Sequence, residues 1–488
     1  MKALVWFRSD LRTGDNPALR QAFKEADSIE AIFSYSENQL NNHNEANVKV
    51  DFLIQHLFSL EKTLNSYNVS LTIIKSNGFD EDPVLIEKYC LDRSIEKVFW
   101  NNQFGDCLDR SIEKVFWNNQ FGEDESLRDK KVLEALESKG ISVETFHDQV
   151  IYMPGYLKTG QGNPYSVFTP FKRKWVENFQ MDFLDIDFHY VKKNPQDITS
   201  NVSTFDFNYS RAHQVDMSLW SIGESAAEKR LHEFLDEKVM NYSKNRNDPI
   251  LEGTSRISPY LALGIISPKK CILEALKINN FEFTSGNTGI TKWIDEIVWR
   301  EFYKNIMFSF PKVSRGQPFQ DYSKKIKWRY CEEEFKAWKE GKTGFPIVDA
   351  AMRQIRNEGW MHNRLRMVVA MFFTKNMLHD WRLGEAYFMQ NLIDGDFASN
   401  NGGWQWSSST GTDAAPYFRI FNPITQSTNF DKEGLFIKKY IPELKDLDKS
   451  VIHNPPQEHR KYCNYPEPIL DLKESRLRAI EAFKIAKS

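Results

Sequence analysis

The chain has 488 residues, of which 41% are hydrophobic and 27% charged, enough for about two to four domains. The net charge of −3 excludes a global basic field, so any phosphate contacts must come from local clusters. No apolar run reaches the roughly eighteen residues of a membrane span, and the opening MKALVWFRSDLR does not resemble a signal peptide. The five cysteines show neither CxxC nor zinc spacing, which predicts no metal site and a reducing, cytoplasmic location.

The first 147 residues alternate short apolar runs with helical stretches such as 50–67. This alternation predicts a Rossmann-like α/β domain with a parallel sheet. Neither GxGxxG nor a P-loop follows the first run, so the sheet carries no familiar dinucleotide or ATP motif. The predicted strands are 3–7, 30–36, 70–76, 97–100 and 141–146.

An exact duplication interrupts this first domain. CLDRSIEKVFWNNQFG occurs at 90–105 and again at 107–122. Functional repeats diverge and structural repeats come in three or more copies, so the doublet indicates a recent tandem duplication or a sequence artefact. Both copies carry the strand IEKVFW and compete for one position in the sheet. We expect the second copy to fill it, because it leads into the helix starting near Glu125, and the first to be extra, extended or looped out.

The composition changes twice after residue 147. Residues 148–225 contain PGYLKTGQGNPYS and KKNPQDITSNVSTFDFNYSR and are expected to form a long surface linker. From 226 to 488 the apolar residues follow a helical period, and no convincing strand remains. The predicted architecture is therefore an α/β parallel-sheet domain (1–147), a linker (148–225) and an all-α domain (226–488).

The stretch WIDEIVWREFY, at 293–303, places unusual side chains on one helical face. A face that mixes a carboxylate, a guanidinium and indoles suits the wall of a cavity for a flat ligand with polar edges. The alternative is a partly buried structural face with an internal ion pair. The residues on this face are Trp293, Glu296, Trp299, Arg300 and Tyr303.

The stretch WMHNRLRMVVAMFF, at 360–373, carries a second candidate face. Asn363, Arg366 and Met367 share it, and Met offers a soft surface to aromatic ligands. His362 in the same stretch is expected to be a structural histidine.

Two further stretches complete the set of candidates. In DGDFASNNGGWQW, at 394–406, glycines let the backbone approach a ligand. A buried Asp394 would need a cation, for which Arg366 is the candidate. In EGTSRIS, at 252–258, hydroxyls and backbone N–H groups suit a phosphate, although such runs are usually plain helix caps.

These stretches, in this order, resemble the photolyase/cryptochrome family, and the resemblance covers essentially the whole chain. VWFRSDLRTGDNPAL is followed by EGTSRIS, WREFY, GKTGFPIVDAAMRQI, WMHNRLRM and DGDFASNNGGWQWSSSTGTDAAPYFRIFNP. Within the family, the chain is most similar to bacterial class I photolyases, which split cyclobutane pyrimidine dimers. The resemblance implies a light-driven DNA repair enzyme, a monomer that binds UV-damaged DNA through its backbone without sequence specificity.

The resemblance also implies FAD, held in a bent shape by the helical domain. Asn400 matches the position that faces the flavin N5, where plant cryptochromes typically have Asp and animal ones Cys. Asn there favours a photolyase, because it supports fully reduced flavin. The positions that match the family's cofactor contacts are Tyr242, Thr254, Ser255, Arg256, Ile257, Ser258, Trp293, Arg300, Asn363, Arg366, Asp394, Asp396 and Asn400.

The two tryptophans of the Trp-Gln-Trp run take different roles in the resemblance. Trp406 and Trp299 match the jaws of a pocket for the flipped-out dimer, on whose bases aromatic rings stack. Glu296 would hydrogen-bond the damaged bases, and Met367 would pack on them. The implied catalytic set is Glu296, Trp299, Asn363, Met367, Asn400 and Trp406.

Trp404, the other tryptophan of that run, matches the first member of an electron-transfer chain. The chain would continue through Trp381 to Trp328. Contacts with DNA phosphates are expected from Arg246, Arg364 and Arg419.

Folate-type members of the family bind a pterin antenna between the two domains, which implies 5,10-methenyltetrahydrofolate here. His43 and Glu125 match that pattern. Asp124 stands where Asn is expected, Ser314 replaces a Cys and Arg315 replaces a Lys. A deazaflavin or an empty pocket are the alternatives.

Three other functions stay open: a cryptochrome-type blue-light sensor, a (6-4) photolyase, and a flavin- or DNA-binding protein inactivated by the duplication. Asn400 disfavours the sensor, as do the 65 residues after FRIFNP, too few for a signalling tail. WMHNRLRM lacks the His-rich pattern of (6-4) enzymes. Every catalytic candidate lies outside the duplicated domain, which disfavours the inactive protein.

Overall fold

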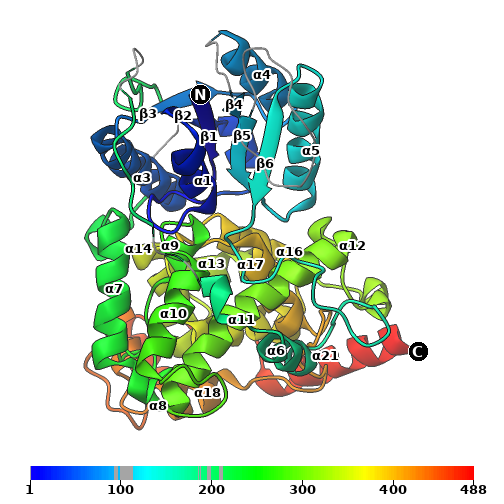
Figure 1. Cartoon of the computed structure of the whole chain (residues 1–488). Helices are drawn as coiled ribbons and strands as arrows, with labels where there is room; N and C mark the ends of the chain where they lie inside the picture. Colours follow the sequence, from blue (N-terminus) through cyan, green and yellow to red (C-terminus); the bar gives the residue numbers. More distant parts are fainter. Residues whose placement is uncertain are drawn as a thin grey trace.

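The computed structural model describes residues 2–92, 97–98, 114–184, 186, 188–194, 199–207 and 213–488. A parallel sheet flanked by helices forms the upper part in Figure 1, and helices form the lower part. The strands run in the order β3-β2-β1-β5-β6, and every pairing is parallel, which confirms the predicted fold class. The five strands are β1 (Lys2–Phe7), β2 (Ser28–Tyr35), β3 (Ser70–Lys75), β5 (Lys114–Asn118) and β6 (Ser142–Phe146).

Helices cover both faces of the sheet, as a parallel sheet requires. The helices of this part are α1 (Pro17–Glu25), α2 (Glu37–Asn42), α3 (Asn47–Ser66), α4 (Asp82–Asp92) and α5 (Glu123–Glu137). Successive side chains of a strand point to opposite faces. Accordingly, Val5 of β1 packs with α1 and α3, whereas the next residue, Trp6, packs with α4 and α5.

The second copy of the duplication supplies strand β5, as predicted. Val115 pairs with Leu4 of β1 on one side and with Val143 of β6 on the other. From the first copy, the short strand β4 (Lys97–Val98) pairs at Ala3 on the same edge of β1. The rest of the first copy's strand and the junction, 93–96 and 99–113, lie outside the described residues.

The remaining described residues form helices with no further strand element, only two isolated bridges. Every helix in the described part of the chain is too short or too polar to span a bilayer. The helices are α6 (Phe168–Glu177), α7 (Glu224–Glu237), α8 (Tyr242–Asn245), α9 (Ser258–Ala262), α10 (Pro268–Ile278), α11 (Thr288–Ser309), α12 (Pro311–Ser314), α13 (Glu332–Glu340), α14 (Pro346–Glu358), α15 (Asn363–Met371), α16 (Trp381–Met389), α17 (Phe397–Ser408), α18 (Pro423–Phe430), α19 (Leu435–Tyr440), α20 (Gln457–Cys463) and α21 (Leu472–Lys487).

The segment expected to be a surface linker contributes to the core instead. Trp175 of α6 is completely buried, and its indole N–H donates to Glu301 of α11 at 2.9 Å. The same carboxylate accepts the backbone N–H groups of Ile151 and Tyr152 at 2.7 and 3.1 Å. Burial raises the pKa of Glu301 to about 7. Polar composition suggested a solvated path, but aromatic side chains spaced along this segment hold it against α11.

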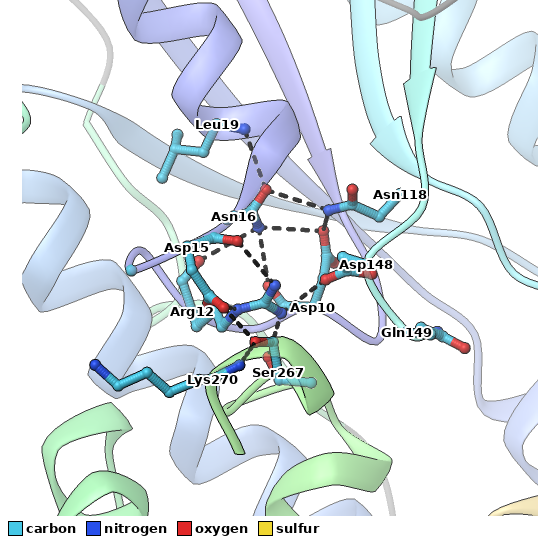
Figure 2. Close-up of polar contacts among 12 residues, drawn as sticks. Asp10, Arg12, Asp15, Asn16, Leu19, Asn118, Asp148, Gln149, Ser267 and Lys270 are labelled. Carbon is cyan, nitrogen blue, oxygen red and sulfur yellow. Dashed lines mark hydrogen bonds and ion pairs between the residues drawn. The ribbon is translucent and has the colours of Figure 1, made fainter. Parts of the chain in front are cut away.

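A buried polar cluster joins the sheet to the helical part (Figure 2). Arg12, in the loop after β1, pairs with Asp148 at 2.7 Å and donates to the carbonyl of Gly264 at 3.0 Å. Asp15 of the same loop accepts a hydrogen bond from Ser267, the residue that caps α10. Removing one member of such a buried cluster would leave an unpaired charge, so the cluster holds the two parts in one arrangement.

Candidate functional site

Helix α11 carries the predicted residues of 293–303, and none of them lines the cavity between α15 and α17 described below. It begins at the N-cap Asn287, whose side chain accepts two backbone N–H groups of the first turn. Trp293 is buried, and its indole N–H donates to the hydroxyl of Ser255 at 3.3 Å. Arg300 donates to the carbonyl of Gln149 at 2.5 Å and to a second carbonyl at 3.2 Å. Trp293 and Arg300 are thus fixed by groups near residues 149 and 255–261.

Asp394 gathers two of the other predicted residues. Nη2 of Arg366 lies 3.0 and 2.8 Å from its two carboxylate oxygens, and Ser258 donates its hydroxyl at 2.7 Å. Asp394 is buried, and a buried carboxylate is stable only with such partners. The cation that the sequence suggested for Asp394 is therefore in place.

Asp396 starts α17 and carries an ion pair that sequence reasoning missed. Its carboxylate accepts the N–H and the hydroxyl of Ser399 at 2.9 and 2.8 Å, which caps the helix. Lys304 of α11 lies 3.0 Å away. Burial alone would raise the pKa of Asp396, but the Lys304 ammonium and the Arg300 guanidinium hold it well below its ordinary value.

The two asparagines of α17 meet Glu385 of α16. Asn400 donates to the carbonyl of Glu385 at 2.9 Å, and Asn401 lies 3.5 Å from its carboxylate. Burial raises the pKa of Glu385 to about 7. The Glu385 backbone thus holds the Asn400 side chain, while the Glu385 carboxylate lies beside Asn401.

A cavity opens between α15 and α17. Gly403 and the buried Trp404 form part of its lining. Its lining mixes polar side chains with the apolar Phe388, Leu392 and Trp404, which suits a flat heterocycle with polar edges. The predicted residues that line it are Asn363, Arg366, Met367, Asp394, Asp396 and Asn400.

The adjacent glycines of α17 face different surroundings. A Cβ on Gly402 would lie 2.2 Å from the ring of Tyr303, whereas a Cβ on Gly403 would meet nothing within 4 Å. We expect Gly402→Ala to lower the free energy of unfolding by about 1–3 kcal/mol, because α17 must move off α11. Gly403→Ala should leave it unchanged or raise it by up to about 1 kcal/mol, since Ala favours the helix.

Urea unfolding of the two glycine variants, with flavin absorbance per protein, checks this pair. Gly403→Ala should bind less flavin despite normal stability, because Gly403 lines the cavity. Equal stability losses in both variants would contradict the close approach of α17 to Tyr303.

Of the three tryptophans predicted to carry electrons, Trp404 lines this cavity. Trp404 and Trp381 are buried in one aromatic core, and Trp328 packs against it. The indole nearest to Trp404 among the described ring pairs belongs to Trp338, at a centroid distance of 6.2 Å. Trp338 was not singled out from the sequence, since a lone Trp on an amphipathic helix reads as ordinary core.

The predicted substrate residues lie where α11 and α17 reach the surface. Trp299 and Trp406 are both half-buried. Glu296 is paired with Arg246, which was expected to contact phosphate. Arg364 donates to the side chain of Asn247 at 2.8 and 3.2 Å. Of the three predicted phosphate contacts, only Arg419 is exposed without a side-chain partner in the described part of the chain.

In the loop predicted to bind phosphate, Arg256 already contacts other residues of the protein. Arg256 has a positive φ of 48° and lies 3.2 Å from Glu358. Its guanidinium also stacks over Trp360, 4.6 Å from the ring centroid. Tyr242 is buried nearby in α8, whereas Ile257 is buried in the loop and Thr254 is half-buried. His362 accepts the N–H of Arg364 and caps α15, the structural role expected for it.

The four antenna candidates meet in a cleft of about 420 Å³ between the sheet and the helical part. His43 lies 3.8 Å from both Asp124 and Glu125. Arg315, from the helical part, pairs with Glu123 across the cleft, with Nε and Oε2 2.7 Å apart. Lys304 and Asp396 also line the cleft, so this cleft and the α15–α17 cavity share Asp396.

Comparisons with known proteins agree with this arrangement. The family model of DNA photolyase matches residues 3–192 of the chain, and the family model of the FAD binding domain of DNA photolyase matches residues 293–485. The deoxyribodipyrimidine photo-lyase of Buchnera aphidicola subsp. Acyrthosiphon pisum is 38% identical over 496 residues, 100% of this chain and 97% of the relative. That of Escherichia coli K12 is 37% identical over 488 residues, 99% and 98% of the two chains. The structure of a class III photolyase from Agrobacterium tumefaciens superposes with a TM-score of 0.86 at 30% identity. The superposition covers 100% of this chain and 98% of that photolyase.

A parallel α/β domain joined to a helical FAD-binding domain, with a polar-edged cavity beside buried indoles, defines a photolyase-type flavoprotein. The chain belongs to the DNA photolyase family. The resemblance drawn from the motifs is confirmed, and FAD is the cofactor of its C-terminal domain.

Proposed function

We propose that the protein is a deoxyribodipyrimidine photo-lyase, which uses light to split cyclobutane pyrimidine dimers in UV-damaged DNA. The observation that carries the proposal is the cavity edged by Asp394, Asp396 and Asn400, in a chain whose relatives at 37% and 38% identity bear that name. We place the enzyme in the bacterial cytoplasm, because its substrate is the DNA of the genome. We also propose that it acts as a monomer.

The residues around the cavity fit a flavin. Gly403 leaves room for a ring close to the α17 backbone. Asn363 and Asn400 offer amide donors and acceptors at the edge, with the Arg366–Asp394 pair behind them. When bound, FAD supplies an electron donor that light excites, while the protein supplies position and electrostatics.

The half-buried indoles of α11 and α17 suit a flipped-out dimer. Extrusion costs least where a lesion has already weakened pairing. Trp299 and Trp406 would stack on the extruded bases, which is worth about 1–3 kcal/mol per base. Arg246 pairs with the Glu296 carboxylate, which would hydrogen-bond the extruded bases, and the remaining N–H groups of the guanidinium would contact phosphate.

We propose a pterin antenna, 5,10-methenyltetrahydrofolate, in the cleft between the sheet and the helical part. His43, Glu125 and Arg315 would hold its polar groups. The wall that this cleft shares with the flavin cavity supports the assignment, because an antenna must transfer its excitation to the flavin. Extraction of the purified protein and fluorescence of the released chromophore would distinguish a pterin from a deazaflavin.

Light-dependent repair of a thymine-dimer oligonucleotide by purified, chemically reduced protein tests the proposed function. We expect repair in the light and none in a dark control. No repair, with flavin bound and dimer DNA retained, would point instead to a cryptochrome-type sensor or a (6-4) photolyase. Absence of flavin from the protein would indicate that the duplication at 90–122 has compromised folding.

A further inference from the structure

We propose that Phe168 is a positioning residue, which fixes the plane of the Trp299 indole for stacking against the lesion. The inference rests on the proposed function, because it concerns the pocket that binds the dimer. Phe168 opens helix α6, in the segment that composition had suggested to be a linker.

The contact between the two rings is close and parallel. Their centroids lie 3.6 Å apart and their planes differ by 8°. Phe302 touches Trp299 edge-on at 5.6 Å, and Tyr303 lies at the same distance with a 33° tilt. Phe168 therefore covers one face of the indole, and a substrate base can stack only on the other face.

Phe168 is itself held from two sides. It is buried, and its ring meets Phe302 of α11 edge-on at 5.9 Å. Its backbone N–H donates to Asp413 at 3.1 Å, which serves as the cap that Val167 does not provide. Farther along the helix, Lys172 pairs with Asp295 of α11 at 2.5 Å. Helix α6 thus lies fixed beside α11 (Figure 1).

The loop that holds Phe168 also reaches the second proposed jaw. Thr412 donates its hydroxyl to the carbonyl of Ser166, two residues before Phe168. Ala415 of the same loop donates its N–H to the carbonyl of Trp406 at 3.2 Å. The start of α6 is therefore connected by hydrogen bonds to α17 and by ring stacking to α11. This arrangement sets the two jaws relative to each other.

The Trp299 indole, already packed on one face, loses little conformational freedom when a base stacks on its other face. Such preorganisation raises the affinity for the dimer. Phe168→Leu keeps an apolar side chain but removes the flat face. We expect it to weaken binding of thymine-dimer DNA roughly three- to tenfold, without changing binding of undamaged DNA. Phe168→Tyr, which keeps the face, should bind the dimer like the unaltered protein. Light-driven flavin reduction should stay unchanged in both variants.

Two further variants separate positioning from loss of structure. Phe171→Leu makes the same change in another buried residue of α6, whose ring contacts Tyr165 and Phe302, and it should leave dimer binding unchanged. In a Trp299→Ala background, Phe168→Leu should have no additional effect, because the ring that it positions is gone.

Titrations with dimer and undamaged oligonucleotides decide between the outcomes. Unaltered dimer binding by Phe168→Leu, equal losses in Phe168→Leu and Phe171→Leu, or an additive loss in the Trp299→Ala background would each overturn the inference. Failure of the unaltered protein to prefer dimer DNA would instead overturn the proposed function, so the two can be told apart.

Discussion

Trp404→Phe is expected to abolish light-driven reduction of bound oxidised flavin, yet to leave repair by chemically reduced protein intact. Trp404 is buried at the cavity, and its indole N–H has no hydrogen-bond partner among the described residues, so no polar contact is lost. A benzene ring is much harder to oxidise than an indole. The variant should remain folded, at a cost of about 1–2 kcal/mol for the smaller ring. Absorbance of flavin under illumination, followed by a repair assay after dithionite reduction, measures both properties.

Trp338→Phe provides the matched control for this variant. Trp338 is also buried, its indole N–H likewise lacks a partner among the described residues, and its ring lies 6.2 Å from that of Trp404. It lies outside the proposed chain through Trp381 and Trp328, so photoreduction should persist. Loss of photoreduction in Trp338→Phe would redirect the chain through that residue. Loss of repair by the pre-reduced Trp404→Phe protein would contradict the different roles proposed for Trp404 and Trp406.

Asp396→Asn is expected to lower the free energy of unfolding by about 3–5 kcal/mol and to empty the flavin site, because it leaves Lys304 without its carboxylate. Asn can still accept the N–H of Ser399, so the cap of α17 is preserved and only the charge is removed. Urea unfolding and flavin absorbance per protein measure the two effects.

The pH dependence of stability provides a second measure of the same pair. The folded pKa of Asp396 is depressed, so its contribution is present above the ordinary value of 3.8 and is lost as the pH falls below it. Between about pH 4 and pH 2, the unaltered protein should therefore lose stability more steeply than Asp396→Asn does. Equal acid slopes would contradict the ion pair.

Combining Asp396→Asn with Lys304→Met separates stability from cofactor binding. Replacing both members of a buried pair by neutral groups is often nearly neutral, so the double variant should unfold within about 1–2 kcal/mol of the unaltered protein. Its flavin content should stay low, because Asp396 lines the cavity. Recovery of flavin together with stability would remove Asp396 from the proposed cofactor shell.

Local patterns in the sequence were sufficient for several parts of the fold. The apolar runs gave the five paired strands of the sheet, and the second copy of the duplication was correctly placed as β5. Helical spacing identified α11, and the quoted motifs identified the family. These features depend on short apolar runs, on residues three or four positions apart, or on long sequence motifs. All of these are visible along the chain itself.

By itself, therefore, the sequence determined the fold class, the family and the stretches that carry the candidate site. Apart from the Arg366–Asp394 pair, which the sequence suggested, only the tertiary structure decided the partners. It paired Arg246 with Glu296 and Lys304 with Asp396, and it stacked Phe168 of the supposed linker on Trp299. The physical reason is that each of these contacts joins segments far apart in the chain. Their meeting depends on how helices cross and on which buried charges need partners, and neither follows from the periodicity of a single segment.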